Sequence, residues 1–86
     1  MLEMSKESFL NYHKALKRAM YSYVQGKDIK RNGQMILFIL KEFDIDIELD
    51  KLISVNASIT YQDVSSYVDN LFFGEGDLFR KVAFYD

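Results

Sequence analysis

The 86-residue sequence contains no cysteine, no proline and no tryptophan. Without cysteine the chain cannot form a disulfide, a thiolate nucleophile or the usual cysteine-based zinc sites. It therefore has no need of an oxidising compartment, and we expect a cytoplasmic protein. Glycine occurs only at positions 26, 33, 74 and 76, so the natural breaks in the chain are predicted at 25–28 and 74–77.

Long apolar runs are absent as well. The longest apolar block, 35–40, has six residues, whereas a segment that spans a bilayer needs roughly 18–20. Residues 1–14 lack the uninterrupted apolar stretch of a signal peptide. The sequence therefore predicts no membrane partner.

The apolar content is nevertheless high enough for a real core. Hydrophobic residues make up 49% of the chain and include seven Phe and six Tyr, which excludes an intrinsically disordered protein. A chain of this length forms a single small globular domain over residues 1–86. Its thirteen Phe and Tyr rings exceed what one small core readily hides, and such rings are favoured anchors of protein interfaces.

Charge is small in total but unevenly distributed. Residues 1–35 carry seven basic and three acidic residues, a net charge of +4, and residues 36–86 carry four basic and ten acidic residues, a net charge of −6. Halves of opposite sign can neutralise each other within one fold, pair between subunits, or face a charged partner. The sequence leaves these three alternatives open.

The first predicted element is a helix over residues 6–24. Apolar residues such as Phe9 and Leu16 recur at helical spacing and form one stripe. Ser5 is placed to cap the start of this helix, and Gly26 is placed to end it in a left-handed conformation.

A second helix is predicted over about 29–43, with Asp28 as its N-cap. It is apolar on two sides, and such a helix is normally surrounded by its own protein. We therefore expect it at the centre of the core, although a short buried strand is the alternative for its apolar block. One stripe consists of Ile29, Ile36, Leu37, Leu40 and Phe43, and the other of Met35, Phe38 and Ile39.

The middle of the chain allows two interpretations. Residues 47–55 fit a short helix that ends near Asn56, whereas the alternating polar and apolar residues of about 45–61 fit a β-hairpin. Thr60 and Asp63 form a predicted capping box at the start of a helix over 61–73. The tail from 78 onward is predicted to form a final helical turn or an edge strand.

The predicted fold class is accordingly all-α, a small bundle of three to four helices. The alternative is an α+β fold, with a short hairpin at about 45–61 and a C-terminal edge strand. Helical periodicity and cap residues favour the bundle.

Motifs for catalysis or metal binding are missing. His13 is the only histidine, so it cannot form a two-histidine metal site, and we interpret it as an ordinary surface or boundary residue. The acidic run over 44–50 fails the calcium-loop pattern, because Leu49 and Val55 occupy the positions that require Gly and Glu. No serine lies in a nucleophile motif. The sequence predicts no catalytic residue, no metal, no cofactor and no enzyme activity.

A cluster of basic residues around the first interhelical turn could contact phosphates, which makes a nucleic-acid-binding module the alternative function. A helix–turn–helix over 49–71 is not favoured, because its second helix has no Lys or Arg and would repel DNA. The basic cluster consists of Lys14, Lys17, Arg18, Lys27, Lys30 and Arg31.

The leading hypothesis is a small non-enzymatic regulator that binds and blocks, or modulates, another protein. Asp63, Tyr67 and Asp69 are the predicted partner-binding residues, opposite a partner with a basic surface. A homodimer or other homo-oligomer is a further expectation. Small size with abundant Lys, Ile, Asn, Asp, Phe and Tyr is typical of bacterial, phage or mobile-element accessory proteins such as inhibitors, antitoxins and immunity proteins, an association of composition and not of mechanism.

Overall fold

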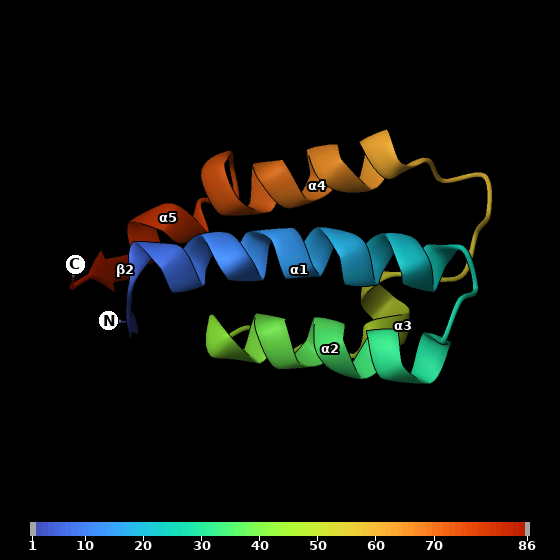
Figure 1. Ribbon diagram of the computed structural model, residues 1–86, viewed down its shortest axis with the longest axis horizontal. Helices are drawn as coiled ribbons and strands as arrows, with labels where there is room; N and C mark the ends of the chain where they lie inside the picture. The colour runs from blue at the N-terminus through green and yellow to red at the C-terminus, as the bar shows by residue number, and fades with distance from the viewer. Residues whose placement is uncertain (1, 86) are drawn as a thin grey trace.

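A computed structural model describes residues 2–85 and shows a bundle built around one central helix. Helix α1 (Lys6–Val24) lies between α2 (Ile29–Glu42) on one side and α4 (Tyr61–Phe73) on the other (Figure 1). Two single-turn helices, α3 (Leu49–Leu52) and α5 (Leu78–Lys81), follow α2 and α4. The predicted small helical bundle is confirmed.

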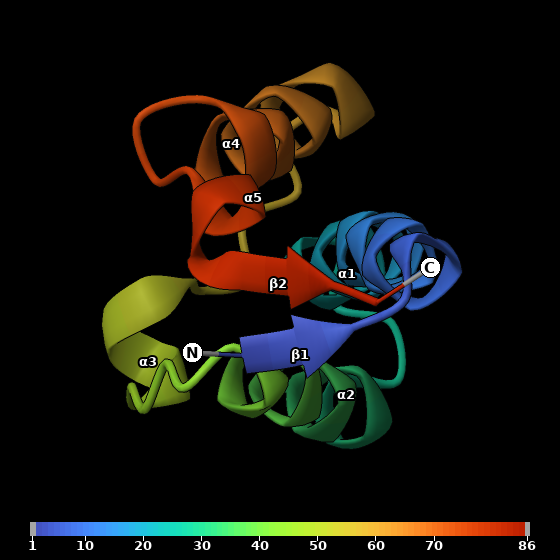
Figure 2. The ribbon, with the colours of Figure 1, turned by 90° about the vertical axis from the view of Figure 1, so that its left-hand side faces the viewer.

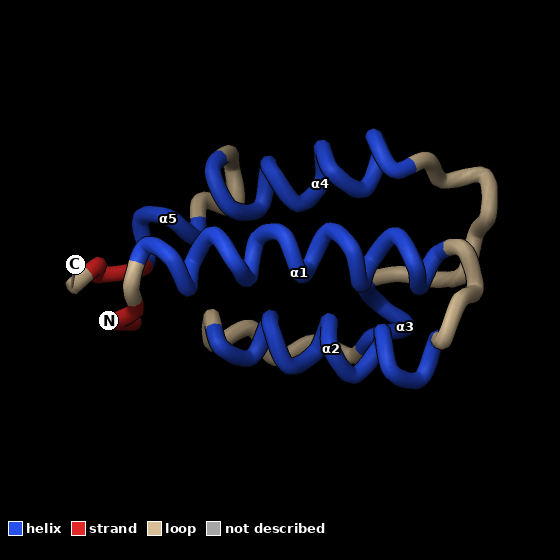
Figure 3. The backbone as a smooth tube through the Cα atoms, in the orientation of Figure 1, coloured by secondary structure: helices blue, strands red, loops and turns tan. Residues whose placement is uncertain are grey.

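Two short strands close one end of the bundle. Strands β1 (Leu2–Met4) and β2 (Val82–Phe84) pair in parallel, with Glu3 opposite Ala83. They lie side by side across the ends of the helices (Figure 2), and Figure 3 separates them from the helices by colour. For residues from 78 onward a helical turn or an edge strand was predicted, and both occur, the turn as α5 and the strand as β2. Strand β1 was not predicted, because three residues are too few to show a periodicity.

Both ends of α1 form as the sequence predicts. The Ser5 hydroxyl accepts a hydrogen bond from the backbone N–H of Ser8 at 3.0 Å. At the other end Gly26 adopts a left-handed φ of 75°. The Gly26 N–H donates to the carbonyl of Tyr23 and the Lys27 N–H to that of Ser22, each at 2.9 Å. This Schellman arrangement satisfies carbonyls that the helix itself leaves unpaired.

The start of α2 differs from the prediction. Asp28 precedes the helix, but its side chain makes no capping hydrogen bond. Its backbone is left-handed, with φ 43° and ψ 53°, whereas a side-chain cap normally requires an extended residue. The tight turn after Gly26 imposes this conformation, and the Asn32 side chain supports the turn by donating to the carbonyl of Lys27 at 2.8 Å.

A second Schellman arrangement ends α2. The Asp44 N–H donates to the carbonyl of Lys41 and the Ile45 N–H to that of Leu40, each at 3.0 Å. Asp44 takes the left-handed position with φ 58°, where glycine is the usual residue. Its carboxylate also lies at the negative end of the helix dipole. The chain therefore ends this helix at a local cost.

We expect Asp44→Gly to raise the free energy of unfolding by about 0.5–1 kcal/mol at pH 7, because it removes the left-handed strain and the unfavourable charge together. Urea denaturation followed by circular dichroism measures the change. Asp46→Gly is the matched control, because Asp46 has no positive φ and glycine there only adds freedom to the unfolded chain. A loss of stability in Asp44→Gly would contradict this account of the helix end.

The middle segment wraps the bundle and forms no hairpin. Residues 45–60 contain no strand, and the predicted helix is reduced to Leu49–Leu52. Ile45 and Ile47 alternate with exposed residues because one side of this extended part faces the core. Further along, Val55 and Ala57 are exposed, so their alternation has no such cause. The segment approaches α2 closely at Gly33, because this residue has no side chain. A Cβ at that position would lie 2.7 Å from the Leu49 side chain. This segment is therefore held by contacts with distant residues of the core, and not by pairing of two strands in the predicted hairpin.

The capping box of α4 is confirmed in full. The Thr60 hydroxyl accepts from the Asp63 N–H at 3.1 Å, and the Asp63 carboxylate accepts from the Thr60 N–H at 3.0 Å. The helix begins at Tyr61 and ends at Phe73, at the predicted positions. This reciprocal pair fixes the direction in which α4 leaves the preceding loop.

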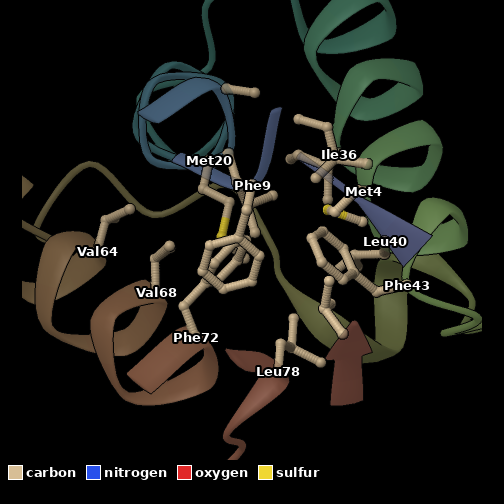
Figure 4. Packing of buried hydrophobic residues seen from close by; sticks show 14 of the residues in the cluster. Met4, Phe9, Met20, Ile36, Leu40, Phe43, Val64, Val68, Phe72 and Leu78 are labelled. Carbon is tan, nitrogen blue, oxygen red and sulfur yellow. The ribbon is translucent and has the colours of Figure 1, made fainter. Parts of the chain in front are cut away.

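Three phenylalanine rings join the three long helices. Phe9 of α1 lies 5.1 Å from Phe72 of α4 and 5.9 Å from Phe43 just after α2, and Phe43 and Phe72 are 5.3 Å apart, between ring centroids. Figure 4 shows them pointing toward one another with aliphatic side chains around them. Each is at most 2% exposed. The surrounding buried residues are Met4, Leu16, Ala19, Met20, Val24, Ile36, Ile39, Leu40, Val64, Val68, Leu78 and Val82.

The prediction that α2 is surrounded by protein was wrong. Only the face toward α1 and α3 is covered, and it buries Ile36, Ile39 and Leu40. Four apolar side chains of this helix are exposed, because among residues 2–85 no element packs on its outer side. They are Ile29, Met35, Leu37 and Phe38.

We expect Phe72→Ala to lower the free energy of unfolding by about 3–5 kcal/mol, because the deletion leaves a cavity where the three helices meet. The measurement is chemical denaturation at a single protein concentration. Tyr85→Ala serves as the control, since this ring is 72% exposed, and it should cost less than about 0.5 kcal/mol. Equal losses in the two variants would show that the ring cluster is not the centre of the core.

Candidate protein-binding groove

An apolar groove opens between α4, the end of α1 and the segment that wraps the bundle. Its volume is about 270 Å³. We call it the α4 groove. Its lining consists of Met20, Val24, Leu52, Ile53, Ile59, Asp63, Val64 and Tyr67.

Local sequence signals build one wall of the α4 groove. Asp63, Val64 and Tyr67 lie on the same side of α4, because residues three and four apart are neighbours on a helix. Val64 is buried at the floor, and Tyr67 is 47% exposed at the rim. The capping box holds the beginning of this wall.

Nonlocal hydrogen bonds hold the opposite wall. The Asn56 N–H donates to the carbonyl of Val24 at 2.8 Å, and the Gln25 side chain donates to the carbonyl of Ile59 at 2.9 Å. Both bonds attach the wrapping segment to the end of α1. A second hollow of about 110 Å³ lies next to the α4 groove and shares Met20, Leu52 and Tyr67 with it. The ring of Tyr67 therefore borders two apolar hollows.

Asp63 supplies the charge of the α4 groove. Two hydrogen bonds with Thr60 lower the pKa of the Asp63 carboxyl below its ordinary value. The bond to the Thr60 backbone has the larger effect, and the bond to its side chain the smaller. The group is therefore an exposed carboxylate at neutral pH. Since no other charged side chain lines the α4 groove among residues 2–85, its rim is complementary to a positive charge.

Asp69, the third predicted partner-binding residue, lies elsewhere on α4. Its Oδ1 atom is 2.7 Å from Nζ of Lys17 and 2.7 Å from Nε2 of His13, both on α1. The rings of Phe72 and Phe73 flank His13 at centroid distances of 5.2 and 5.3 Å. Asp63 and Tyr67 thus share a site, whereas Asp69 links two helices of its own chain.

The sequence contained a signal for this link. His13 and Lys17 are four residues apart and therefore lie on one side of α1. An acidic residue on the facing helix is their natural partner, but nothing local reveals which helix faces which. The hydrogen bond from Lys17 lowers the pKa of the Asp69 carboxyl, and the hydrogen bond from His13 lowers it by a smaller amount.

We expect Asp69→Asn to reduce stability by roughly 0.5–1 kcal/mol at pH 7, a modest figure because the carboxylate is half exposed and screened. The folded-state pKa is lowered, so this contribution is present above the unfolded value of about 3.9 and is lost as pH falls through the folded pKa. The difference between wild type and variant should therefore shrink as the pH falls below about 3.9. Urea denaturation across this pH range tests it.

Asp46→Asn is the control for that experiment. Asp46 is exposed and takes no part in an ion pair among the residues that the structure describes. It should leave stability nearly unchanged at every pH. A pH-independent loss in Asp69→Asn would show that packing, and not charge, is responsible.

The six basic residues of the alternative site lie on α1, on α2 and in the turn between them. Lys17 pairs with Asp69 toward α4, while Arg18 and Arg31 line a shallow groove between α1 and α2. Lys30 lines a different hollow, together with Tyr23 of α1 and Leu49 of α3. The exposed remainder of the cluster is Lys14 and Lys27.

The His13–Asp69 contact is the arrangement nearest to catalytic chemistry. A general base needs a nucleophile or substrate within hydrogen-bond reach, and within residues 2–85 the hydrogen bond of His13 is to Asp69. No group of three His, Asp or Glu side chains in that range could hold a metal ion. Nor does any helix there combine the length and hydropathy needed to cross a bilayer.

Comparison with known proteins adds no functional assignment. The chain matches no protein-family model, no curated protein and no solved structure.

Proposed function

We propose that this protein is a small non-enzymatic regulator that binds another protein through the α4 groove. The observation that carries the proposal is an open apolar groove with one carboxylate, Asp63, at its rim. A partner segment would place two or three apolar side chains in the groove and a Lys or Arg beside Asp63. Binding would block or modulate the partner by covering its surface.

The α4 groove is better suited in size to a few anchoring side chains of a partner protein than to a complete small molecule. Pockets for small molecules are typically about 300–1,000 Å³, and this groove, of about 270 Å³, is smaller and open. Interface energy is concentrated in a few buried anchors, for which such a volume is sufficient. Tyr67, half exposed between two hollows, is suited to contact such an anchor.

Charge supports a basic partner. The carboxylate of Asp63 would accelerate the approach of a positively charged surface and orient it, an effect that falls with salt. Inhibitors, antitoxins and immunity proteins are regulators that act by occupying a partner's surface in this way. The proposal places the protein in that functional class.

The test is affinity capture from the source cells with three versions of the protein. Tyr67→Lys places a long charged side chain in the α4 groove and should abolish capture of the specific partner. Ser66→Lys makes the same change of charge at the next, exposed position and should leave capture intact. Chemical-shift mapping with a peptide of the captured partner should then locate the contact at Val64 and Tyr67.

Capture of the same partners by all three versions would refute a role for the α4 groove. Recovery of nucleic acid in place of protein, with binding that weakens steeply as salt rises, would instead favour the alternative function. In that case Lys30→Glu combined with Arg31→Glu should abolish the binding.

A further inference from the structure

The outer side of α2 carries a stripe with opposite charges at its ends. Four of its residues follow one another at intervals of four, three and four positions, which places them on one side of a helix. The central pair is exposed although apolar, at 40% for Met35 and 55% for Phe38. Figure 1 shows α2 along one edge of the bundle. We call the set Arg31, Met35, Phe38 and Glu42 the α2 stripe.

Both charges of the α2 stripe are placed unfavourably for the helix that carries them. Arg31 lies in the first turn of α2 and Glu42 is its last residue, so both oppose the helix dipole. They are separated by about 16 Å along the helix and cannot pair with each other. Neither residue takes part in any ion pair among residues 2–85.

The surroundings of Glu42 show the same imbalance. Burial, and secondarily the charge of Glu42, raise the pKa of the Tyr12 hydroxyl on α1. The Tyr12 hydroxyl thus lies near Glu42, and no salt bridge within residues 2–85 includes Glu42. A cation from outside the chain would complete this end of the stripe.

The α2 stripe runs from a basic residue through two apolar residues to an acidic one, so it is complementary to a second copy of itself that runs in the opposite direction. We propose that α2 packs antiparallel against α2 of a second copy of this chain, about a two-fold axis between Met35 and Phe38. In this arrangement Arg31 meets Glu42 of the partner subunit, and Met35 meets Phe38 of the partner subunit. Each contact occurs twice, as two-fold symmetry requires. The spacing is that of the apolar seam in antiparallel helix pairs.

The surface beside the α2 stripe admits a second helix. A shallow groove with small side chains of α1 lies beside Arg31 and Met35, and Arg18 and Asp28 also line it. The small side chains are Ala15, Ala19 and Ser22. Small side chains let helices approach closely, so side chains of the partner subunit can lie along this groove. The contact face therefore extends from α2 onto α1.

None of the stripe residues lines the α4 groove. The proposed self-association is therefore independent of the proposed function, and either can fail without the other.

The test measures the dimerisation constant by sedimentation velocity in low salt between about 5 and 500 µM, a range that covers weak dimers. The wild type should dimerise, and less tightly as salt rises. Arg31→Glu alone and Glu42→Arg alone each place like charges opposite one another twice, and each should weaken the dimer about tenfold or more. The double variant R31E/E42R restores both pairs and should recover the wild-type constant.

An equimolar mixture of the two single variants provides a sharper measurement. Each alone repels itself, but a heterodimer of R31E with E42R restores an opposite-charge pair at both ends of the stripe. The mixture should therefore dimerise about as tightly as the wild type. Recovery through an intramolecular contact is excluded, because the two substitutions are on different chains.

Loss of folding does not account for these outcomes. Both single substitutions place the favourable charge at their end of the helix dipole, so the thermal midpoint of the monomer should not fall. Lys30→Glu, next to the stripe but on another side of α2, is the control for charge. Phe38→Ser should abolish the dimer, whereas Phe79→Ser, at a ring that is 48% exposed elsewhere, should not.

Three results would overturn the proposal. They are a wild type that remains monomeric at the highest concentration in low salt, a dimer that is insensitive to Phe38→Ser, and a mixture of R31E with E42R that stays monomeric.

Discussion

The contact of Phe9 with Phe43 and Phe72 is the interaction on which the rest of this structure depends. Helices α2 and α4 both pack on α1, and these rings join all three where they meet. Burying three large rings at one point supplies a large part of the apolar burial of a small core. It also fixes the bundle end that β1 and β2 close.

This arrangement leaves apolar surface on two separate sides. A helix packed on one neighbour can cover only one of its faces, so the outer side of α2 keeps Met35 and Phe38 exposed. The segment after α3 covers the opposite side incompletely and leaves the α4 groove beside Tyr67. A chain of this length cannot cover three helices on all sides. The two uncovered surfaces carry the two proposals, one for a different protein and one for a second copy.

Some charges of the chain are paired within the fold, and others remain without a salt-bridge partner among the described residues. The link from Lys17 and His13 to Asp69 neutralises part of the basic first half within the fold. Asp69, a predicted partner-binding residue, and Lys17, of the predicted basic cluster, are therefore paired with each other within the chain. The charges at the ends of α2 have no such partner among the described residues, and the reversal of sign along this helix is what makes it complementary to itself.

Signals that act over a few residues could be read from the sequence. The Ser5 cap, the Gly26 turn and the reciprocal pair of Thr60 and Asp63 need only their neighbours along the chain, and they fixed the bounds of α1 and α4. Even there, Asp28 failed as a cap, because the preceding turn forced its backbone into a left-handed conformation.

What covers an apolar side chain was decided by the tertiary structure alone. The alternation over 45–60 was compatible with a hairpin, but in the structure Ile45 and Ile47 pack against the core and Val55 is exposed. The two predicted stripes of α2 were equal in sequence, yet the packing divides both of them. It buries Ile39 beside the exposed Phe38 in one stripe and leaves Leu37 of the other exposed. Periodicity records which residues share a side of a helix, whereas burial depends on segments distant in sequence. The sequence by itself thus determined the helices and their ends, and the tertiary structure decided which surfaces remain free to bind.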